Sequence, residues 1–197
     1  TGILGEPQDI VPDISRSEVA RAAGYSIEQV RNANSRGEAL NMMIKGITRI
    51  VTDLYKNNKC HGIVSLAGAS GGAITCAAME AIPVGIPKLI ATPIASGSRP
   101  FSFFIGTKDV MIMHSVIDIM GVNTVSRSIY DNLAGAAVGA VKASGVNKKD
   151  SNAIGITMLG NTTEGAMHLK KCLEKDGYEV VAFHSSGIGG RAMEQMA

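Results

Sequence analysis

The residues best suited to chemistry in this chain lie between Gly62 and Ala73, in the segment GIVSLAGASGGA. Its pattern predicts a buried strand, then a loop made only of Gly, Ala and Ser, then a helix. A parallel strand points its carboxyl end toward the crevice where ligands bind, and a helix N-terminus attracts anions. Small side chains let backbone N–H groups approach a ligand closely. The segment is therefore typical of a phosphate-binding loop.

The same loop also matches the pattern G-x-S-x-G, which marks the nucleophile elbow of many hydrolases. In this alternative Ser70 is the nucleophile and His184 the base, with Asp109 or Asp118 as the acid. A histidine nitrogen should then lie within about 3.2 Å of Ser70 Oγ. From the residues alone, Ser70 either attacks a substrate or donates a hydrogen bond to a ligand.

Other small, hydroxyl-bearing loops follow the remaining expected strands. Phosphate oxygens need convergent N–H and hydroxyl donors, which such loops supply when they meet at one edge of a sheet. The residues expected to bind phosphate are Gly68, Ala69, Ser70, Gly71, Gly72, Ser96, Gly97, Thr107, Asp109, Asn161, Thr162, Thr163, Gly187, Gly189, Gly190 and Arg191.

Asp109 could also hold Mg²⁺ beside the phosphates, although a turn residue before a strand is the simpler interpretation. The four histidines show no metal-ligand spacing, so no other metal site is expected. The chain has neither G-x-x-x-x-G-K-[ST] nor G-x-G-x-x-G, which argues against a P-loop and against a Rossmann NAD site.

Strands that alternate with helices predict an α/β fold, specifically a Rossmann-like, doubly wound parallel sheet followed by the start of a second Rossmann-like lobe. The first lobe is expected to span residues 1–148 and the second 149–197, with a basic linker from Val146 to Ser151. Expected strands cover 62–67, 88–92, 109–113, 153–159 and 178–183. Expected helices cover 16–23, 27–33, 36–56, 73–82, 126–143 and 164–176, with one more after 190.

Local patterns add finer expectations. Capping boxes are predicted at Ser15-x-x-Glu18, Ser26-x-x-Gln29 and Asn161-x-x-Glu164. Residues 101–105 have an extended character. Gly135 and Gly139, inside the helix at 126–143, indicate that this helix packs closely on the sheet.

Composition narrows the class of protein. The 197 residues are 45% hydrophobic and 18% charged, which suits a folded globular domain. A net charge of +2 gives no reason to expect nucleic acid as a partner, and no apolar run approaches the ~20 residues of a membrane span. Three cysteines without CxxC favour a reducing, cytoplasmic location. Homo-oligomerisation stays open, because the helix at 126–143 could pack on the sheet or at a dimer interface.

Seven segments, taken in order, resemble the uncharacterised protein family related to the tomato-mosaic-virus resistance protein. They are ILGEP at 3–7, PDIS at 12–15, RGEA at 36–39, GASGG at 68–72, ASG at 95–97, GTKD at 106–109 and FHSSGIGGRAME at 183–194. Members of that family carry a domain described as a resistance-protein-like ATP-binding domain. The resemblance covers essentially the whole chain and implies two Rossmann-like lobes with ATP or a similar nucleotide between them. It also implies a fragment that lacks the family's N-terminal strand, loop and helix and the rest of the second lobe.

The sequence therefore predicts an ATP- or phosphometabolite-binding domain of a two-lobed cytoplasmic protein, with phosphates held by Gly/Ser loops at the carboxyl ends of strands. One alternative is an enzyme that acts on a phosphorylated metabolite. The second is a serine hydrolase that uses Ser70 and His184. Whether the chain is an enzyme is left open.

Overall fold

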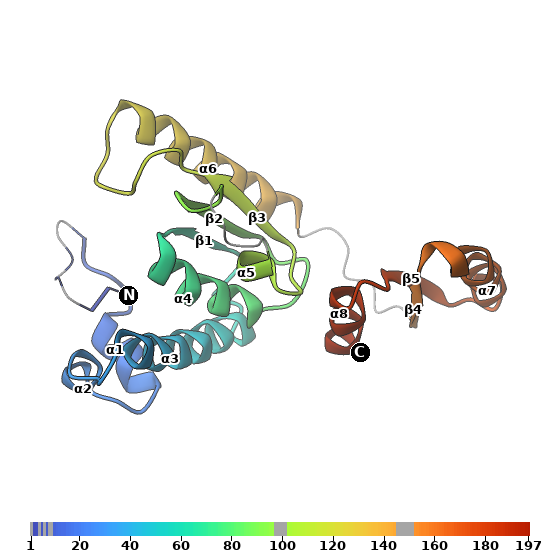
Figure 1. Cartoon of the computed structure of the whole chain (residues 1–197), viewed down its shortest axis with the longest axis horizontal. Helices are drawn as coiled ribbons and strands as arrows, with labels where there is room; N and C mark the ends of the chain where they lie inside the picture. Colours follow the sequence, from blue (N-terminus) through green and yellow to red (C-terminus); the bar gives the residue numbers. More distant parts are fainter. Residues whose placement is uncertain (1, 4, 6, 8–9, 97–101, 145–151) are drawn as a thin grey trace. The chain divides into compact units, whose positions relative to one another are not determined.

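The computed structural model describes residues 2–3, 5, 7, 10–96, 102–144 and 152–197 (Figure 1). The chain divides into two compact units, Thr1–Ser144 and Gly145–Ala197, each of mixed α/β structure. The linker expected at 146–151 lies outside the described residues. Among the helices that the structure describes, none has the length and apolarity needed to cross a membrane.

A parallel three-stranded sheet forms the centre of the first unit. Its strands, in the order β1-β2-β3, are β1 (Ile63–Leu66), β2 (Lys88–Thr92) and β3 (Val110–His114). The middle strand, β2, is buried along its whole length. Because the strands are parallel, the segments that follow Leu66, Thr92 and His114 all leave from the same edge of the sheet.

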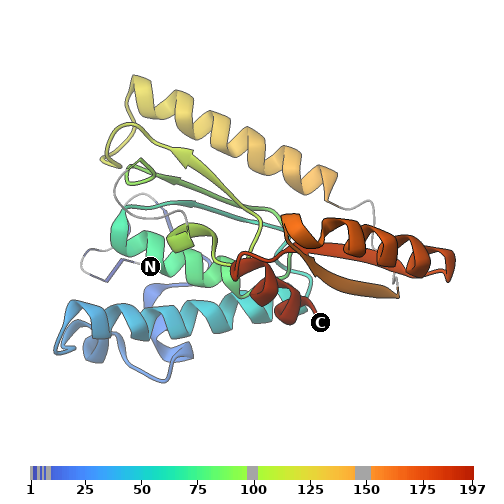
Figure 2. The ribbon, with the colours of Figure 1, turned by 45° about the vertical axis from the view of Figure 1, so that its right-hand side comes forward.

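Helices lie on both sides of this sheet (Figures 1 and 2). They are α1 (Arg16–Ala22), α2 (Ile27–Arg31), α3 (Arg36–Lys56), α4 (Ala69–Glu80), α5 (Ser102–Ile105) and α6 (Thr124–Ala143). Helices α4 and α5 cover one side and α6 the other, while α3 packs on the outer side of α4. The capping boxes predicted at Ser15 and Ser26 are confirmed, with both reciprocal hydrogen bonds present in each.

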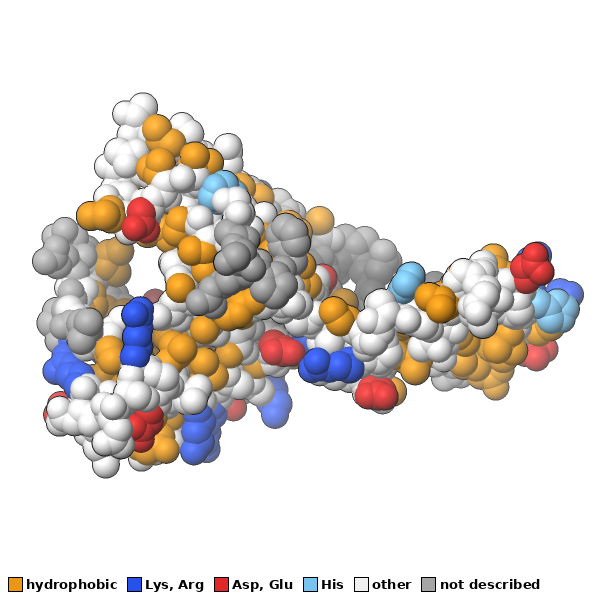
Figure 3. Space-filling view, in the orientation of Figure 1, with side chains coloured by type: hydrophobic (Ala, Val, Ile, Leu, Met, Phe, Trp, Pro, Cys, Tyr) orange, Lys and Arg blue, Asp and Glu red, His pale blue; other side chains and the backbone are white. Residues whose placement is uncertain are grey.

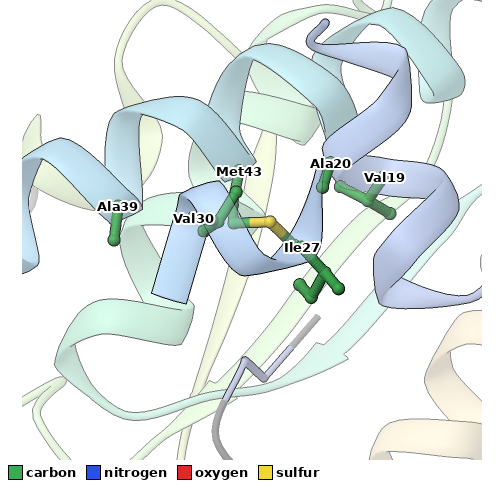
Figure 4. Packing of buried hydrophobic residues seen from close by; sticks show 6 residues of the cluster. All are labelled: Val19, Ala20, Ile27, Val30, Ala39 and Met43. Atoms are coloured by element: carbon green, nitrogen blue, oxygen red, sulfur yellow. The ribbon is translucent and has the colours of Figure 1, made fainter. Parts of the chain in front are cut away.

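Helices α1, α2 and α3 share a small apolar core on the side of α4 that faces away from the sheet (Figure 4). Its buried residues are Val19, Ala20, Ile27, Val30, Ala39 and Met43. Helix α1 approaches the backbone of α3 at Gly46, where an added Cβ would lie 1.9 Å from the Val19 carbonyl oxygen. Only glycine fits there, so Gly46 sets the distance between these two helices.

Helices α3 and α4 pack side by side and run in the same direction. Ile74, in the first half of α4, packs against the cluster that contains Ala39 and Met43 from the start of α3. Tyr55, at the end of α3, packs against the cluster that contains Ile82, just beyond the end of α4. The N-termini of the two helices therefore lie at the same end of this layer.

The second unit contains a parallel two-stranded sheet of β4 (Ala153–Met158) and β5 (Glu179–His184). A 3-10 turn, η1 (Gly160–Thr162), and α7 (Thr163–Lys175) follow β4, and α8 (Ile188–Met196) follows β5. In the register, Met158 pairs with His184. The segments after these two residues therefore leave from the same, carboxyl edge of the small sheet.

Three local predictions are wrong. Residues 102–105 form α5 and not an extended segment, because Phe104 is buried against Ala67 and Ile90; residue 101 lies outside the described residues. Helix α7 begins at Thr163, and its N-cap is Thr162, whose side chain caps none of the helix N–H groups, so the capping box expected from Asn161 does not form.

The glycines of α6 also differ from expectation. A Cβ placed at Gly135 or Gly139 would meet nothing within 4 Å, so neither glycine marks close packing on the sheet. They lie on the exposed side of the helix.

Replacing Gly46 with Ala should lower the free energy of unfolding by about 2 to 3 kcal/mol, because the new methyl group overlaps the Val19 carbonyl. The matched control is Gly135→Ala. It should raise the free energy of unfolding by roughly 0.5 to 1 kcal/mol, because alanine favours the helix and a Cβ at this position meets no other atom within 4 Å. Urea unfolding followed by circular dichroism measures both. Equal effects of the two substitutions would contradict the packing described for α1 on α3.

Candidate functional site

The loop predicted at Gly68–Gly72 is the N-terminus of α4. Gly68 is the N-cap, and residues 69–72 form the first helical turn, closed by a hydrogen bond from Gly72 N–H to Gly68 O at 2.7 Å. The first N–H groups of a helix have no partner inside the helix, and Gly68 has no side chain to accept them. The N–H groups of Ala69, Ser70 and Gly71 are therefore available to an anion.

Arg36 lies beside this helix end, a contact that the sequence analysis missed. Its Nη2 donates to Ser70 Oγ at 2.7 Å, from the first residue of α3 to the first turn of α4. The contact joins residues 34 positions apart, and it depends on the parallel packing of the two helices. The one indication in the sequence was that RGEA at 36–39 stands among the seven segments that carry the family resemblance.

A cavity of about 680 Å³ opens between α3, the start of α4 and the N-terminal segment. Arg31, Ser35, Arg36 and Ser70 line it with polar groups. Arg31 Nε donates to the Ile3 carbonyl at 3.0 Å, which holds the N-terminal segment to α2. Among the described residues that line the cavity, both charged side chains are arginines and none is acidic.

Three of the seven segments set out above meet at this cavity. Gly2, Ile3 and Gly5 line it from the chain's start, Arg36 and Ala39 from α3, and Ser70 and Gly71 from α4. Lys and Arg side chains are visible over the α1–α3 part of this unit (Figure 3). The arrangement combines a positive helix end, two guanidinium groups and a hydroxyl around one hollow, which suits a negatively charged ligand.

Asp109 and Thr107 do not lie at this site, contrary to prediction. Both precede β3, so they lie at the amino edge of the sheet, whereas α4 begins at the carboxyl edge. Strands of four or five residues separate these edges by roughly 15 Å. Thr107 and Asp109 therefore cannot flank phosphates bound at Gly68–Gly72.

Asp109 has a structural role at its own edge. Its Oδ1 accepts a hydrogen bond from the fully buried Lys88 Nζ at 2.8 Å, and its Oδ2 accepts from Gly85 N–H at 2.8 Å. Lys88 Nζ also donates to the carbonyls of Pro83 and Ile86, both at 2.7 Å. Partial burial opposes ionisation of Asp109, but these hydrogen bonds and the Lys88 charge outweigh it and lower the pKa of the carboxyl.

This arrangement does not fit Mg²⁺ at Asp109, because both carboxylate oxygens already accept protein donors, one of them a cation. In the part of the chain that the structure describes, no group of three or more His, Cys, Asp or Glu side chains is placed to hold a metal.

Ser96 does lie at the carboxyl edge, and it contacts a residue that the sequence analysis did not select. Ser96 Oγ and His114 Nε2 are 3.2 Å apart, and His114 Nδ1 lies 3.3 Å from the Thr92 carbonyl oxygen. Thr92 and His114 end β2 and β3. Gly97, the next expected residue, lies outside the described residues.

In the second unit, the two predicted loops lie together at the carboxyl edge of β4 and β5. The Thr162 hydroxyl accepts from Leu159 N–H at 3.0 Å and donates to Leu159 O at 3.1 Å. Thr163 Oγ1 donates to the same carbonyl at 3.1 Å. These two hydroxyls stabilise the turn, and Asn161 lies between them and Gly160.

Of the two predicted loops of the second unit, the one after β5 is more similar to the start of α4 than the one after β4. Gly187 is the N-cap of α8, with φ +83 and no side-chain cap. Gly189, Gly190 and Arg191 form the first turn. A Cβ at Gly189 would lie 2.0 Å from the His184 carbonyl oxygen, so glycine is required for this tight turn.

Within the first unit, the surroundings of Ser70 favour a hydrogen-bonding role over that of a nucleophile. Ser70 Oγ accepts from Arg36, while the base of the serine hydrolase alternative, His184, belongs to the second unit, so that alternative stays a prediction. Asp109 lies at the opposite edge of the sheet and pairs with Lys88. Cys76, on the same helix, is no better as a nucleophile, because burial, with a smaller contribution from Glu80, raises the pKa of its thiol to about 11.

Comparison with known proteins places both units in one family. Residues 1–145 match the N-terminal domain of an uncharacterised protein family (UPF0261), and residues 151–197 match the C-terminal domain of the same family. A UPF0261 protein of Clostridium tetani is 43% identical over 197 residues, which cover 99% of this chain and 48% of that protein.

Two tomato (Solanum lycopersicum) proteins are also similar. The ToMV resistance protein Tm-1(GCR237) is 34% identical over 170 residues, which cover 83% of this chain and 22% of that protein. The ToMV susceptible protein tm-1(GCR26) is 34% identical over 167 residues, which cover 82% of this chain and 22% of that protein. The chain thus spans about half the length of the Clostridium relative and about a fifth of the tomato proteins.

Replacing Asp109 with Asn should lower the free energy of unfolding by about 2 kcal/mol at pH 7, because it leaves the buried Lys88 ammonium without its counter-charge. The pKa of Asp109 is lowered on folding, so its contribution is complete above its unfolded pKa of about 3.9 and is lost as pH falls through the lower folded value. The stability difference between wild type and variant should therefore shrink in acid.

Urea unfolding at pH 7, 5 and 3 measures this difference, with the exposed Asp131→Asn as the control that should change little. A difference between wild type and Asp109→Asn that stays constant from pH 7 to pH 3 would show that the Lys88 pair does not carry the effect.

Proposed function

We propose that this chain, which belongs to the uncharacterised protein family (UPF0261), binds the anionic group of a small molecule between α3 and the start of α4. The ligand class is ATP or another phosphate-bearing metabolite. The observation that carries the proposal is the N-terminus of α4, which lacks a side-chain cap and has the Arg36 guanidinium 2.7 Å from Ser70 Oγ.

Three kinds of donor converge there. The N–H groups of residues 69–71 point out of the helix end. The Ser70 hydroxyl accepts from Arg36 and can still donate its own proton to a ligand. Arg36 adds a planar set of donors that matches two phosphate or carboxylate oxygens at once. Such charge-assisted hydrogen bonds are roughly twice as strong as neutral ones.

The direction of the helices strengthens the positive field. Both α3 and α4 present their N-termini at this end, and each carries a partial positive charge there. The α3 end is already capped, since Ser35 Oγ accepts from Glu38 N–H at 3.1 Å. Helix α3 therefore contributes Arg36 and its dipole, while α4 contributes free N–H groups.

The proposal includes a Rossmann-like, doubly wound arrangement for the sheet. Parallel strands in the order β1-β2-β3 with helices on both sides support it, as does a candidate site at the carboxyl ends of the strands. In the second unit, Gly187 to Arg191 stay a predicted phosphate-binding segment. The cytoplasmic location and self-association also stay predictions.

An enzyme that acts on a phosphorylated metabolite is the second candidate, favoured by the Ser96 and His114 pair. Histidine is the side chain that most often acts as a general acid or base, and His114 lies at the same edge of the sheet as the start of α4. If this alternative is correct, His114→Asn should abolish turnover of the metabolite and leave its affinity unchanged.

Arg36→Gln should weaken the binding of ATP or pyrophosphate roughly 10- to 100-fold, because one charge-assisted contact is lost. Isothermal titration calorimetry measures the affinity. The control is Arg49→Gln, also on α3, which contacts the Ala22 carbonyl and does not line the cavity. Wild-type affinity in Arg36→Gln, or no binding of any phosphate compound to the wild type at millimolar concentration, would refute the proposal.

Gly68→Asp should raise stability and abolish binding together. An aspartate N-cap would accept the free N–H groups of α4 and add roughly 0.5 to 1 kcal/mol to the free energy of unfolding. The same carboxylate would occupy and repel the anion site. Space is open, since a Cβ at Gly68 meets nothing within 4 Å, whereas one at Gly71 lies 3.1 Å from Ala67 Cβ.

Gly68→Ala serves as the control for this experiment, because it adds the Cβ without a capping group. Thermal melts and calorimetry report stability and binding on the same samples. Retained phosphate affinity in Gly68→Asp would remove the start of α4 from the site.

A further inference from the structure

We infer that the ligand of this cavity is an amphipathic anion: a phosphate or carboxylate group on an apolar body, such as an alkyl, acyl or aryl chain. The inference rests on the proposed function and adds to it the chemical class of the ligand. It distinguishes such a molecule from a sugar phosphate, whose body carries many hydroxyl groups.

The polar and apolar lining residues of the cavity separate along the helices. Arg36 and Ser70 stand in the first turns of α3 and α4, and Arg31 ends α2. The apolar side of the cavity lies one to two turns farther along α3 and α4 and includes Leu40, Met43 and Ile74. Met43 also belongs to the α1–α3 core (Figure 4).

The polar side chains of the described lining residues already make hydrogen bonds or are cationic. Ser35 Oγ accepts from Glu38 N–H, Ser70 Oγ accepts from Arg36, and Arg31 Nε donates to Ile3 O. No described lining residue is Asp, Glu, Asn or Gln, the side chains that usually accept protons from sugar hydroxyls. A sugar placed against the apolar side would lose water without gaining hydrogen bonds, which costs binding free energy.

The volume fits a body of appreciable size. At about 680 Å³ the cavity falls within the range of pockets that take drug-sized ligands, which is more than a bare phosphate ion fills. Sites of that kind combine an apolar lining with a few polar groups that fix orientation. Here the arginines and the helix end would orient the anion, and Leu40, Met43 and Ile74 would contact the body.

The test is a series of ligands for the wild-type chain: inorganic phosphate, methyl, butyl and hexyl phosphate, and glucose 6-phosphate. Affinity should rise roughly twofold to fourfold for each added methylene, because each buries further apolar surface. Glucose 6-phosphate should bind no better than methyl phosphate. Equal affinity across the alkyl series, or tighter binding of glucose 6-phosphate than of hexyl phosphate, would overturn the inference.

A variant locates the effect. Leu40→Asn should lower the ratio of hexyl phosphate affinity to methyl phosphate affinity, both measured in the variant, because Leu40 lies on the apolar side of the cavity. Leu54→Asn, also half-buried on α3 but outside the cavity, is the matched control and should keep the wild-type ratio. If Leu40→Asn folds and its affinity still rises from methyl to hexyl phosphate as in the wild type, the inference is contradicted. If the variant does not fold, the wild-type ligand series alone tests the inference.

The outcomes separate this inference from the proposed function. Binding that depends on Arg36 but not on the length of the alkyl group would support the anion site and refute the amphipathic ligand. Absence of binding for every compound in the series, with ATP or pyrophosphate still bound, would refute the amphipathic ligand alone, and absence of binding for ATP and pyrophosphate as well would refute both.

Discussion

The parallel packing of α3 on α4 is the contact on which the candidate site depends. It places the first residue of α3 beside the first turn of α4, so that Arg36 meets Ser70 across 34 positions of sequence. It also brings two helix N-termini to one end of the layer, where their partial positive charges add. Gly46 fixes the other side of α3, because its missing side chain lets α1 pack against the backbone.

The two edges of the central sheet differ in how their polar groups are satisfied. At the amino edge, Lys88 and Asp109 bind each other and nearby backbone groups, which leaves neither carboxylate oxygen for a ligand. At the carboxyl edge, the start of α4 has no side-chain cap, and its N–H groups remain available. The Lys88–Asp109 ion pair and the candidate ligand site therefore lie at opposite edges of the same sheet.

Much of the secondary structure was predictable, because it follows from local patterns. The periodicity of Leu40, Met43 and Ile47 predicts α3 with the bounds observed, and the capping boxes at Ser15 and Ser26 form as expected. The junction from strand to helix was correctly placed at Gly68–Gly72, but residues 69–72 form the first turn of α4 and not the loop predicted before a helix at 73–82. What local patterns cannot show is which distant residues become neighbours, and so Arg36 and His114 were missed.

Each error has its own physical cause. Asp109 was grouped with the phosphate loops from its composition, although its place before a strand puts it at the amino edge of a parallel sheet. Helix α5 is too short for a periodic pattern, and the burial of Phe104 decides its structure. Gly135 and Gly139 show that glycine in a helix does not by itself reveal close packing.

The most direct measurement of the central claim is a titration of the isotope-labelled chain with hexyl phosphate, followed by the backbone amide chemical shifts in NMR spectra. The account predicts saturable shifts for Ala69, Ser70 and Gly71, at the start of α4, and none at Gly85 or Asp109. Shifts confined to Gly85 and Asp109, or shifts that spread without saturation, would contradict an anion site at this helix end.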